Sequence, residues 1–102
     1  MATHPKDSSA REAAEQIAIS AIGFIASDPA LMPRFLAISG IEASQIRQAA
    51  AEPGFFAGVL QFIMAHEPTL QGFCEATNTP PADVGAALRA LPFGDDRFDI
   101  ST

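Results

Sequence analysis

The residues best suited to chemistry in this chain are few and lie apart from one another. His66 and Glu67 are the only adjacent histidine and acid in the 102 residues. A zinc-protease helix would carry a second histidine four residues after the first, but Leu70 occupies that position. The pair also falls at a predicted junction between two helices. We therefore interpret His66 as a solvated linker residue beside a helix start.

Cys74 is the only cysteine, which excludes an internal disulfide and a metal site built from several thiolates. A catalytic thiol needs a nearby base or a helix N-terminus to lower its pKa. Cys74 falls in the middle of a predicted helix, about two turns from His66. Leu36 takes the equivalent place in an internal repeat described below. We interpret Cys74 as a small buried hydrophobic residue.

A last candidate is the pair of carboxylates on Asp95 and Asp96, in a C-terminal segment that nothing is predicted to shield from water. The seven glycines are scattered and form no phosphate-binding loop. No nucleophile stands with a base and an orienting group, and the sequence holds no cluster of metal ligands. The sequence therefore predicts a protein that is not an enzyme and that uses no cofactor and no metal.

Composition indicates a single globular domain. Hydrophobic residues make up 48% of the chain and charged residues 18%, and all eight aromatic residues are phenylalanine, which suits a packed core. The net charge of −6 and the scatter of the six basic residues argue against nucleic acid as a partner. The N-terminus has no secretory pattern, and the longest apolar stretch, residues 18–26, is too short to span a bilayer. We expect a cytoplasmic protein with no membrane partner.

The second half of the sequence repeats the first. Phe24–Leu31 returns as Phe62–Leu70 with one inserted residue, and Phe35–Gly40 returns as Phe73–Asn78 at a spacing of 38. Such a repeat predicts two similar structural units. Two units with apolar faces usually bury those faces against each other, here either across a pseudo-two-fold axis or as stacked repeats.

Start and stop signals predict six helices and no strands. Ser9–Glu12 is a capping box that would open the first helix. Asp28-Pro29 predicts a capped second start, although Pro33 is poorly placed one turn later. Gly40 and Asn78 suit the left-handed residue that ends a helix. The first three helices are predicted at about residues 10–26, 29–39 and 43–51, and the next three begin at Glu52-Pro53, Glu67-Pro68 and Thr79-Pro80 and end near residue 65, at Asn78 and before Pro92.

The expected fold is all-α: one compact six-helix domain built from two repeated three-helix units. The domain covers residues 9–92, with units of about 9–51 and 52–92. Residues 1–8 are expected to form a flexible N-terminus, and residues 93–102 an acidic C-terminal tail. The helix that ends near residue 65 is the most apolar, so it is the expected centre of the core.

Four motifs mark the ends and core positions of these helices. They are Phe24-x-x-x-Asp28-Pro29, Arg34-Phe35-Leu36-Ala37-x-x-Gly40-Ile41, Glu52-Pro53-x-Phe55-x-x-x-Val59-Leu60-x-Phe62-Ile63 and Ala90-Leu91-Pro92. Over about residues 10–92 the chain resembles a family of small bacterial proteins called domain of unknown function 3572. The family has no assigned function, so the resemblance implies no catalytic or binding residue. Where the family has Asp-Pro before the third and fourth helices, this chain has Glu42-Ala43 and Glu52-Pro53, and the first departure weakens a helix start.

The first functional hypothesis is a small protein-interaction or adaptor domain, whose partner is an unknown protein or a second copy of the chain. It rests on the missing reactive cluster and on more apolar side chains than six short helices easily bury. The C-terminal tail either folds back over the bundle or is a short motif that docks elsewhere. The candidate surface residues are Leu31, Met32, Ile41 and Met64 in the domain, and Phe98 and Ile100 in the tail.

Two other functions stay open. A small-molecule or lipid carrier would have a cavity lined by Phe and Met between the repeat units. A helix-turn-helix DNA binder would use Gly40 in its turn and Ser44, Gln45, Arg47 and Gln48 to reach base edges. That recognition helix would offer a single cation, and the second repeat has no such polar set, so DNA binding is the weakest of the three hypotheses.

Overall fold

The computed structural model describes residues 5–92, with side chains from Ser9 onward. This part of the chain holds six α-helices and no strand, which confirms the all-α prediction. A 3-10 turn, η1 (Ala43–Gln45), precedes the third helix. The helices are α1 (Pro5–Ala26), α2 (Leu31–Ser39), α3 (Ile46–Ala50), α4 (Phe55–Met64), α5 (Glu67–Thr77) and α6 (Pro81–Ala90).

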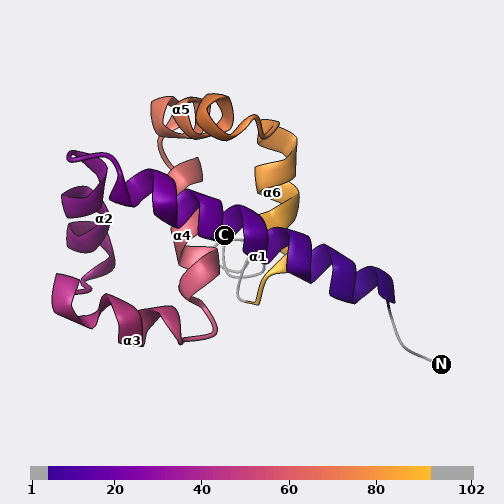
Figure 1. Cartoon of the computed structure of the whole chain (residues 1–102), viewed down its shortest axis with the longest axis horizontal. Coiled ribbons are helices and arrows are strands. Elements are labelled where there is room, and N and C mark those ends of the chain that lie inside the picture. Colours follow the sequence, from indigo (N-terminus) through magenta and orange to yellow (C-terminus); the bar gives the residue numbers. More distant parts are fainter. Residues whose placement is uncertain (1–4, 93–102) are drawn as a thin grey trace, which may run out of the picture.

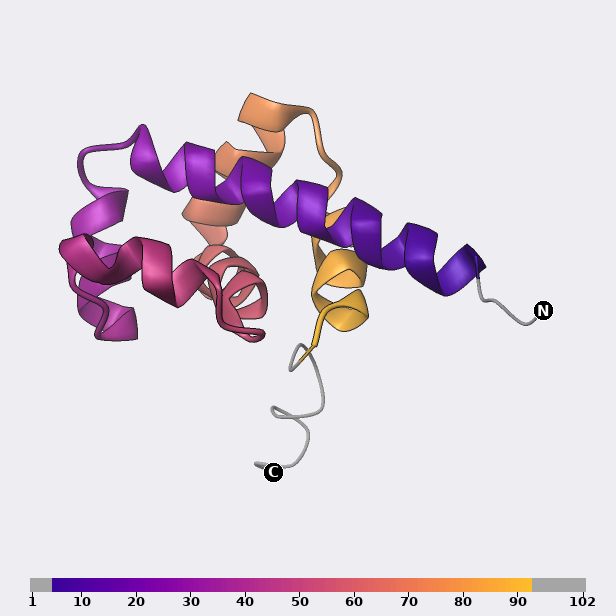
Figure 2. The same ribbon diagram turned by 60° about the horizontal axis from the view of Figure 1, so that its bottom comes forward.

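The longest helix, α1, crosses α4 near the middle of the molecule. Helices α2 and α3 lie on one side of this crossing, and α5 and α6 lie on the other (Figures 1 and 2). α1 packs most extensively on α6 and α4, and it also contacts α2 and α5. The Cα radius of gyration is 13.7 Å, close to the roughly 13 Å of a compact domain of about 100 residues.

Helix α4 is at the centre of the core, as its composition predicts. Five of its ten residues are buried, and they face α1, α5 and α6. Edge-to-face contacts between phenylalanine rings extend this core toward α2. The buried residues of α4 are Phe55, Ala57, Val59, Leu60 and Ile63.

The buried face of α1 is made largely of alanine. Ala14, Ala18 and Ala21 are at most 1% exposed and recur at helical spacing, followed by Ile25. Methyl side chains let neighbouring helices approach α1 closely. Van der Waals contacts between closely packed helices therefore stabilise this face, with little contribution from large side chains. Ile19, which lies off this face, is 50% exposed.

The first helix begins earlier than predicted. α1 starts at Pro5, and proline suits the first turn because its missing N–H would have had no helical partner. Ser9 and Glu12 therefore lie inside the helix, and the capping box was a wrong start signal. Residues 5–8, predicted to precede the domain, are part of α1.

Helix α2 begins two residues later than predicted, and a turn at Asp28 explains the delay. The Ala30 N–H donates a hydrogen bond of 2.8 Å to Asp28 Oδ1, and the Leu31 N–H donates one of 3.1 Å to the Asp28 carbonyl. The later start puts Pro33 at the third position of α2. An N–H at that position has no acceptor within the helix, so Pro33 removes no helical hydrogen bond.

The left-handed helix ends predicted at Gly40 and Asn78 are confirmed. Gly40 has a φ of 77° and Asn78 a φ of 56°. The N–H of Gly40 donates to the Leu36 carbonyl, and the N–H of Asn78 donates to the Cys74 carbonyl. The same helix stop therefore recurs at two positions that the sequence repeat makes equivalent.

The third helix is much shorter than predicted. In place of one helix over residues 43–51, the chain forms η1 and then α3, which has five residues. Neither element contains a fully buried residue, and neither begins with a side-chain cap. With no cap and little packing to offset the cost of nucleation, only a short helix forms.

The contacts do not divide the molecule into two separate three-helix bundles, because α1 packs mainly on helices of the second half. Two pairs of phenylalanine rings also join the halves. The ring centroids of Phe24 and Phe73 lie 5.6 Å apart, and those of Phe35 and Phe62 lie 5.3 Å apart. The two halves of the chain therefore share one core.

Candidate functional site

An apolar groove of about 370 Å³ opens to solvent between α2 and α4. Its base holds the rings of Phe35 and Phe62, and Gly58 leaves one wall without a side chain. Ile38 is the large apolar residue exposed at the groove, with 66% of its surface accessible. The other lining residues are Arg34, Ser39, Gln61, Ala65 and His66.

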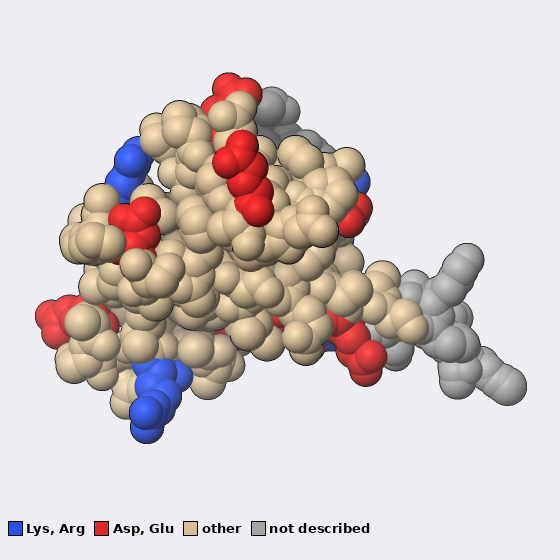
Figure 3. Space-filling view, turned by 45° about the horizontal axis from the view of Figure 1, so that its top comes forward, with Lys and Arg blue, Asp and Glu red and all other residues tan. Residues whose placement is uncertain are grey.

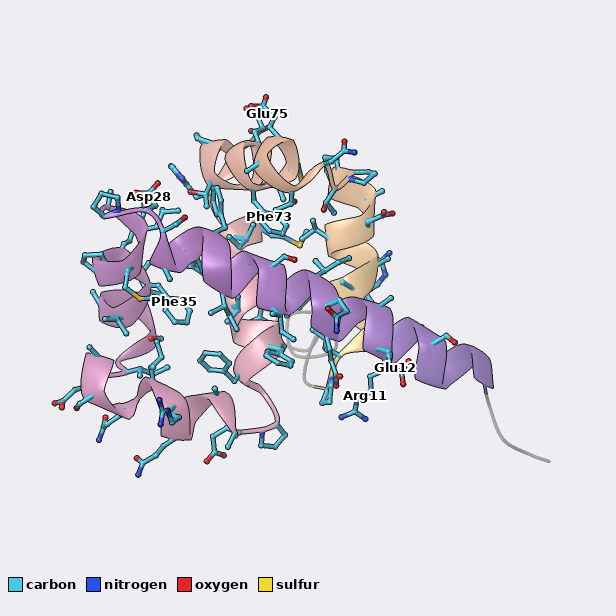
Figure 4. The ribbon with its side chains drawn as sticks, viewed as in Figure 1. Arg11, Glu12, Asp28, Phe35, Phe73 and Glu75 are labelled. Carbon is cyan, nitrogen blue, oxygen red and sulfur yellow. The ribbon has the colours of Figure 1, made fainter. Side chains whose placement is uncertain are left out.

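Helical spacing puts these residues on facing surfaces of the two helices. Phe35 and Ile38 are three residues apart on α2. Gly58 and Phe62 are four residues apart on α4, and Ala65 follows three residues later as the C-cap of that helix. Phe35 points from α2 toward α4 (Figure 4). Its ring meets the edge or face of Phe62 and of Phe55, so the aromatic layer under the groove is packed while the space above it stays open.

His66 stands at one end of the groove, just before α5. A hydrogen bond of 2.8 Å joins its Nδ1 to Oγ1 of Thr69, which is buried. His66 lies in the linker before α5, as predicted, but its side chain is half-buried and so less solvated than predicted. His66 links the end of α4 to the first turn of α5 and presents its ring at the groove.

Cys74 packs against the core, as expected for a small hydrophobic residue. The thiol is half-buried, and desolvation by this burial raises its pKa above the usual value. An activated nucleophile needs a pKa shift in the opposite direction. Within residues 9–92, no three His, Cys, Asp or Glu side chains gather in a way that could hold a metal ion.

The candidate surface residues named from the sequence lie in several environments. Leu31 is only 9% exposed and belongs to the core, because it shares the inner face of α2 with Phe35 one turn later, so its placement on the surface was wrong. Met32 and Ile41 are half-buried against the core. Met64 is 37% exposed, and its terminal methyl lies over Gly85 of α6. Phe98 and Ile100 lie outside the described residues.

Sequence reasoning missed Ile38 and the groove beside it. Ile38 stands where the second copy has the small residue Ala76. That difference does not predict exposure, because Val59 stands where the first copy has Ala21 and is fully buried. The exposure of Ile38 is a result of how α2 packs against α4.

The proposed helix-turn-helix would have α3 as its recognition helix. α3 has only five residues, and Arg47 is its only cation. On the face shown in Figure 3, basic and acidic side chains are scattered among a largely uncharged surface. These features give no continuous basic stripe on that face for a phosphate backbone.

In residues 5–92, no single helix has the length and hydropathy needed to cross a membrane. α1 from Ser9 and α2 meet those limits only when taken together, across a bend of 115°.

The model of the family described as Protein of unknown function (DUF3572) matches residues 11–94 of the chain. The matched region contains both helices that form the groove. A search of curated proteins and a search of solved structures gave no significant match. Because the family model covers most of the 102 residues, the chain belongs to this family of proteins of unknown function.

Proposed function

We propose that this chain is a non-catalytic protein-interaction module that works in the cytoplasm and binds its partner in the α2–α4 groove. The observation that carries the proposal is the exposure of Ile38, 66%, beside an open groove with a phenylalanine base. Exposed apolar surface next to a depression is a common mark of a binding site for another protein. The raised pKa of the Cys74 thiol supports the non-catalytic part of the proposal.

Gly58 offers a way to block the groove without disturbing the core. No side chain or neighbouring helix of the described region lies within 4 Å of the point where a Cβ on Gly58 would stand. Gly58→Leu would therefore fill the groove, and replacing a glycine inside a helix does not weaken the helix. Gly23 in α1 has the same open surroundings and does not line the groove, so Gly23→Leu is a matched control.

The test is affinity capture from the native cytoplasm with the tagged full-length chain, read by mass spectrometry. A partner that binds the wild type and Gly23→Leu at equal yield, and that Gly58→Leu loses, is the expected result. Equal capture by all three proteins contradicts the proposal, and so does a wild type that captures no protein and forms no dimer. A second copy of the chain as partner would appear as a dimer mass in solution that Gly58→Leu abolishes.

A small-molecule carrier is a second candidate, favoured by the size and lining of the same groove. A volume of about 370 Å³ falls within the roughly 300–1,000 Å³ of small-ligand sites, and the groove lies between the two halves of the chain, as a carrier would require. It has phenylalanine but no methionine among its lining residues. Native mass spectrometry of the purified protein tests this candidate, because a carried molecule would add its mass to the wild type and not to Gly58→Leu.

We also infer that α1–α3 and α4–α6 are the two units of the sequence repeat, related by a pseudo-two-fold axis. Phe24 is the repeat equivalent of Phe62, and Phe35 is the equivalent of Phe73. The observed pairs, Phe24 with Phe73 and Phe62 with Phe35, therefore exchange partners between units. Reciprocal contacts of this kind are typical of two-fold interfaces and support the inference. In these units α4 is equivalent to α1, and α3 is equivalent to α6. The contact of α1 with α6 therefore has its counterpart in the contact of α4 with α3.

A further inference from the structure

The α2–α4 groove differs in chemistry from the surface that the repeat makes equivalent to it, between α5 and α1. On that second surface, the ring of Phe24 stands 3.4 Å from the point where a Cβ on Gly72 would lie. At the equivalent positions, the α2–α4 groove has a larger apolar side chain, Ile38, and a cation, Arg34. The substitutions between the equivalent positions are Arg34 for Gly72, Ile38 for Ala76, Gly58 for Ser20 and Ala65 for Ser27.

The groove also differs in charge from the rest of the molecule. The chain has a net charge of −6, yet no Asp or Glu lines the groove. Arg34 lines it, and the Arg34 guanidinium pairs with no carboxylate among the side chains of residues 9–92. A guanidinium beside an apolar groove suits a segment that carries carboxylates next to large apolar side chains.

The C-terminal segment of this chain, residues 93–102, has that composition. Phe98 and Ile100 are separated by one aspartate, and Asp95 and Asp96 precede them. In an extended segment, side chains two residues apart point to the same side. Phe98 and Ile100 would therefore enter the groove together. Asp96 points to the same side of the segment, whereas Asp95, Arg97 and Asp99 point to the opposite side.

We propose that the α2–α4 groove binds residues 93–102 of this chain, with Phe98 and Ile100 against the base and an aspartate beside Arg34. This assignment rests on the proposed function, because it names the occupant of the same groove. Six extended residues separate Pro92 from Phe98 and span roughly 20 Å, which sets how far this side chain can reach within its own molecule. Docking on a second copy uses the same contacts.

Backbone NMR of the full-length chain tests the proposal, with the amide order of residues 93–102 as the readout. Docking predicts ordered tail amides in the wild type and in Gly23→Leu. It also predicts that Gly58→Leu loses this order, while the double variant Phe98→Ser/Ile100→Ser shifts the amide signals of Ile38 and Gly58. Tail amides that are equally mobile in the wild type and in Gly58→Leu would overturn the proposal.

A charge-matched pair of variants tests the role of Arg34. Arg34→Gln should lower the docking equilibrium constant up to roughly fivefold, the size expected of an exposed ion pair, and added salt should lower it in the wild type. Arg47→Gln removes an exposed cation from α3, away from the groove, and should leave docking unchanged. Equal effects of the two variants would contradict the assignment of Arg34.

The dependence of docking on protein concentration shows whether the tail binds the groove of its own molecule or that of a second copy. Docking within one molecule is independent of concentration and leaves a monomer mass, whereas docking on a second copy grows with concentration and gives a dimer. If the tail stays mobile but a captured protein still depends on Gly58, the occupant is a partner, so this inference fails and the proposed function stands. If neither the tail nor any captured protein responds to Gly58→Leu, both fail.

Discussion

The side chain of Cys74 illustrates how burial alone sets the behaviour of a single reactive group. The thiol packs against the core, and its pKa is raised by desolvation because the thiolate is the charged form. Below the raised pKa the thiol stays protonated, and the nucleophilic thiolate appears only as the pH rises through that value.

We predict that Cys74 in the folded chain reacts with an aromatic disulfide reagent more slowly at neutral pH than in the same chain unfolded in urea. The rate in the folded chain should climb at a higher pH than the rate in urea. Absorbance of the released thiolate measures both rates, and the single cysteine makes the signal specific. A folded rate equal to or above the unfolded rate would contradict the burial argument.

Phe73 is the largest fully buried side chain, and its ring meets Phe24 across the two halves of the chain. Phe73→Ala should lower the free energy of unfolding by about 3–5 kcal/mol, since it removes a ring and leaves a cavity. Urea unfolding followed by circular dichroism measures the loss. Ile19→Ala, at a position 50% exposed, is the control and should change stability by less than about 0.5 kcal/mol.

At the scale of elements, helix ends are decided by one residue each. Gly40 ends α2 and Asn78 ends α5, both in the left-handed conformation. Glycine adopts this conformation without strain and Asn or Asp with little, whereas other residues are strained there. The stop at Gly40 ends α2 before the chain turns into η1.

We predict opposite effects of alanine at two glycines. Gly40→Ala should destabilise the fold by about 1–2 kcal/mol because its φ is 77°. Gly23→Ala should stabilise the fold by roughly 0.5–1 kcal/mol. Gly23 lies inside α1, and the added Cβ would have no side chain of the described residues within 4 Å. Thermal unfolding of the two variants against the wild type measures the difference, and shifts of the same sign would refute the assignment of the Gly40 conformation.

At the scale of the whole molecule, the helices of one half depend on those of the other. α1 packs mainly against α6 and α4, so removing α1 would expose apolar surface on both of these helices. Each half has about fifty residues, a size at which a chain has little core of its own.

Residues 1–51 and 52–102, prepared as separate fragments, should therefore show little helix and no cooperative unfolding. Mixed in equal amounts, they should regain helical circular dichroism, because each supplies the apolar face that the other lacks. A cooperative thermal transition in either fragment alone would show that the halves fold independently, which would count against the exchanged packing inferred for them.

The sequence by itself determined the features that arise from local backbone chemistry. It predicted the all-α class, the left-handed stops at Gly40 and Asn78, and the end of α6 before Pro92, because these depend on a residue's own φ preference or missing N–H. Local signals gave a wrong helix start where two possible start sites lay close together in the sequence. Ser9–Glu12 has the pattern of a cap, but the chain upstream was free to continue the helix from Pro5.

Only the tertiary structure decided which apolar side chains are buried and where a binding surface lies. Leu31 and Ile38 belong to the same short helix, yet one is 9% and the other 66% exposed. Periodicity marks a helix as amphipathic but does not say which neighbour covers which part of its face. Here the rings of Phe35 and Phe62 meet below Ile38 and no other described helix covers it, so the groove exists because of how α2 stands against α4.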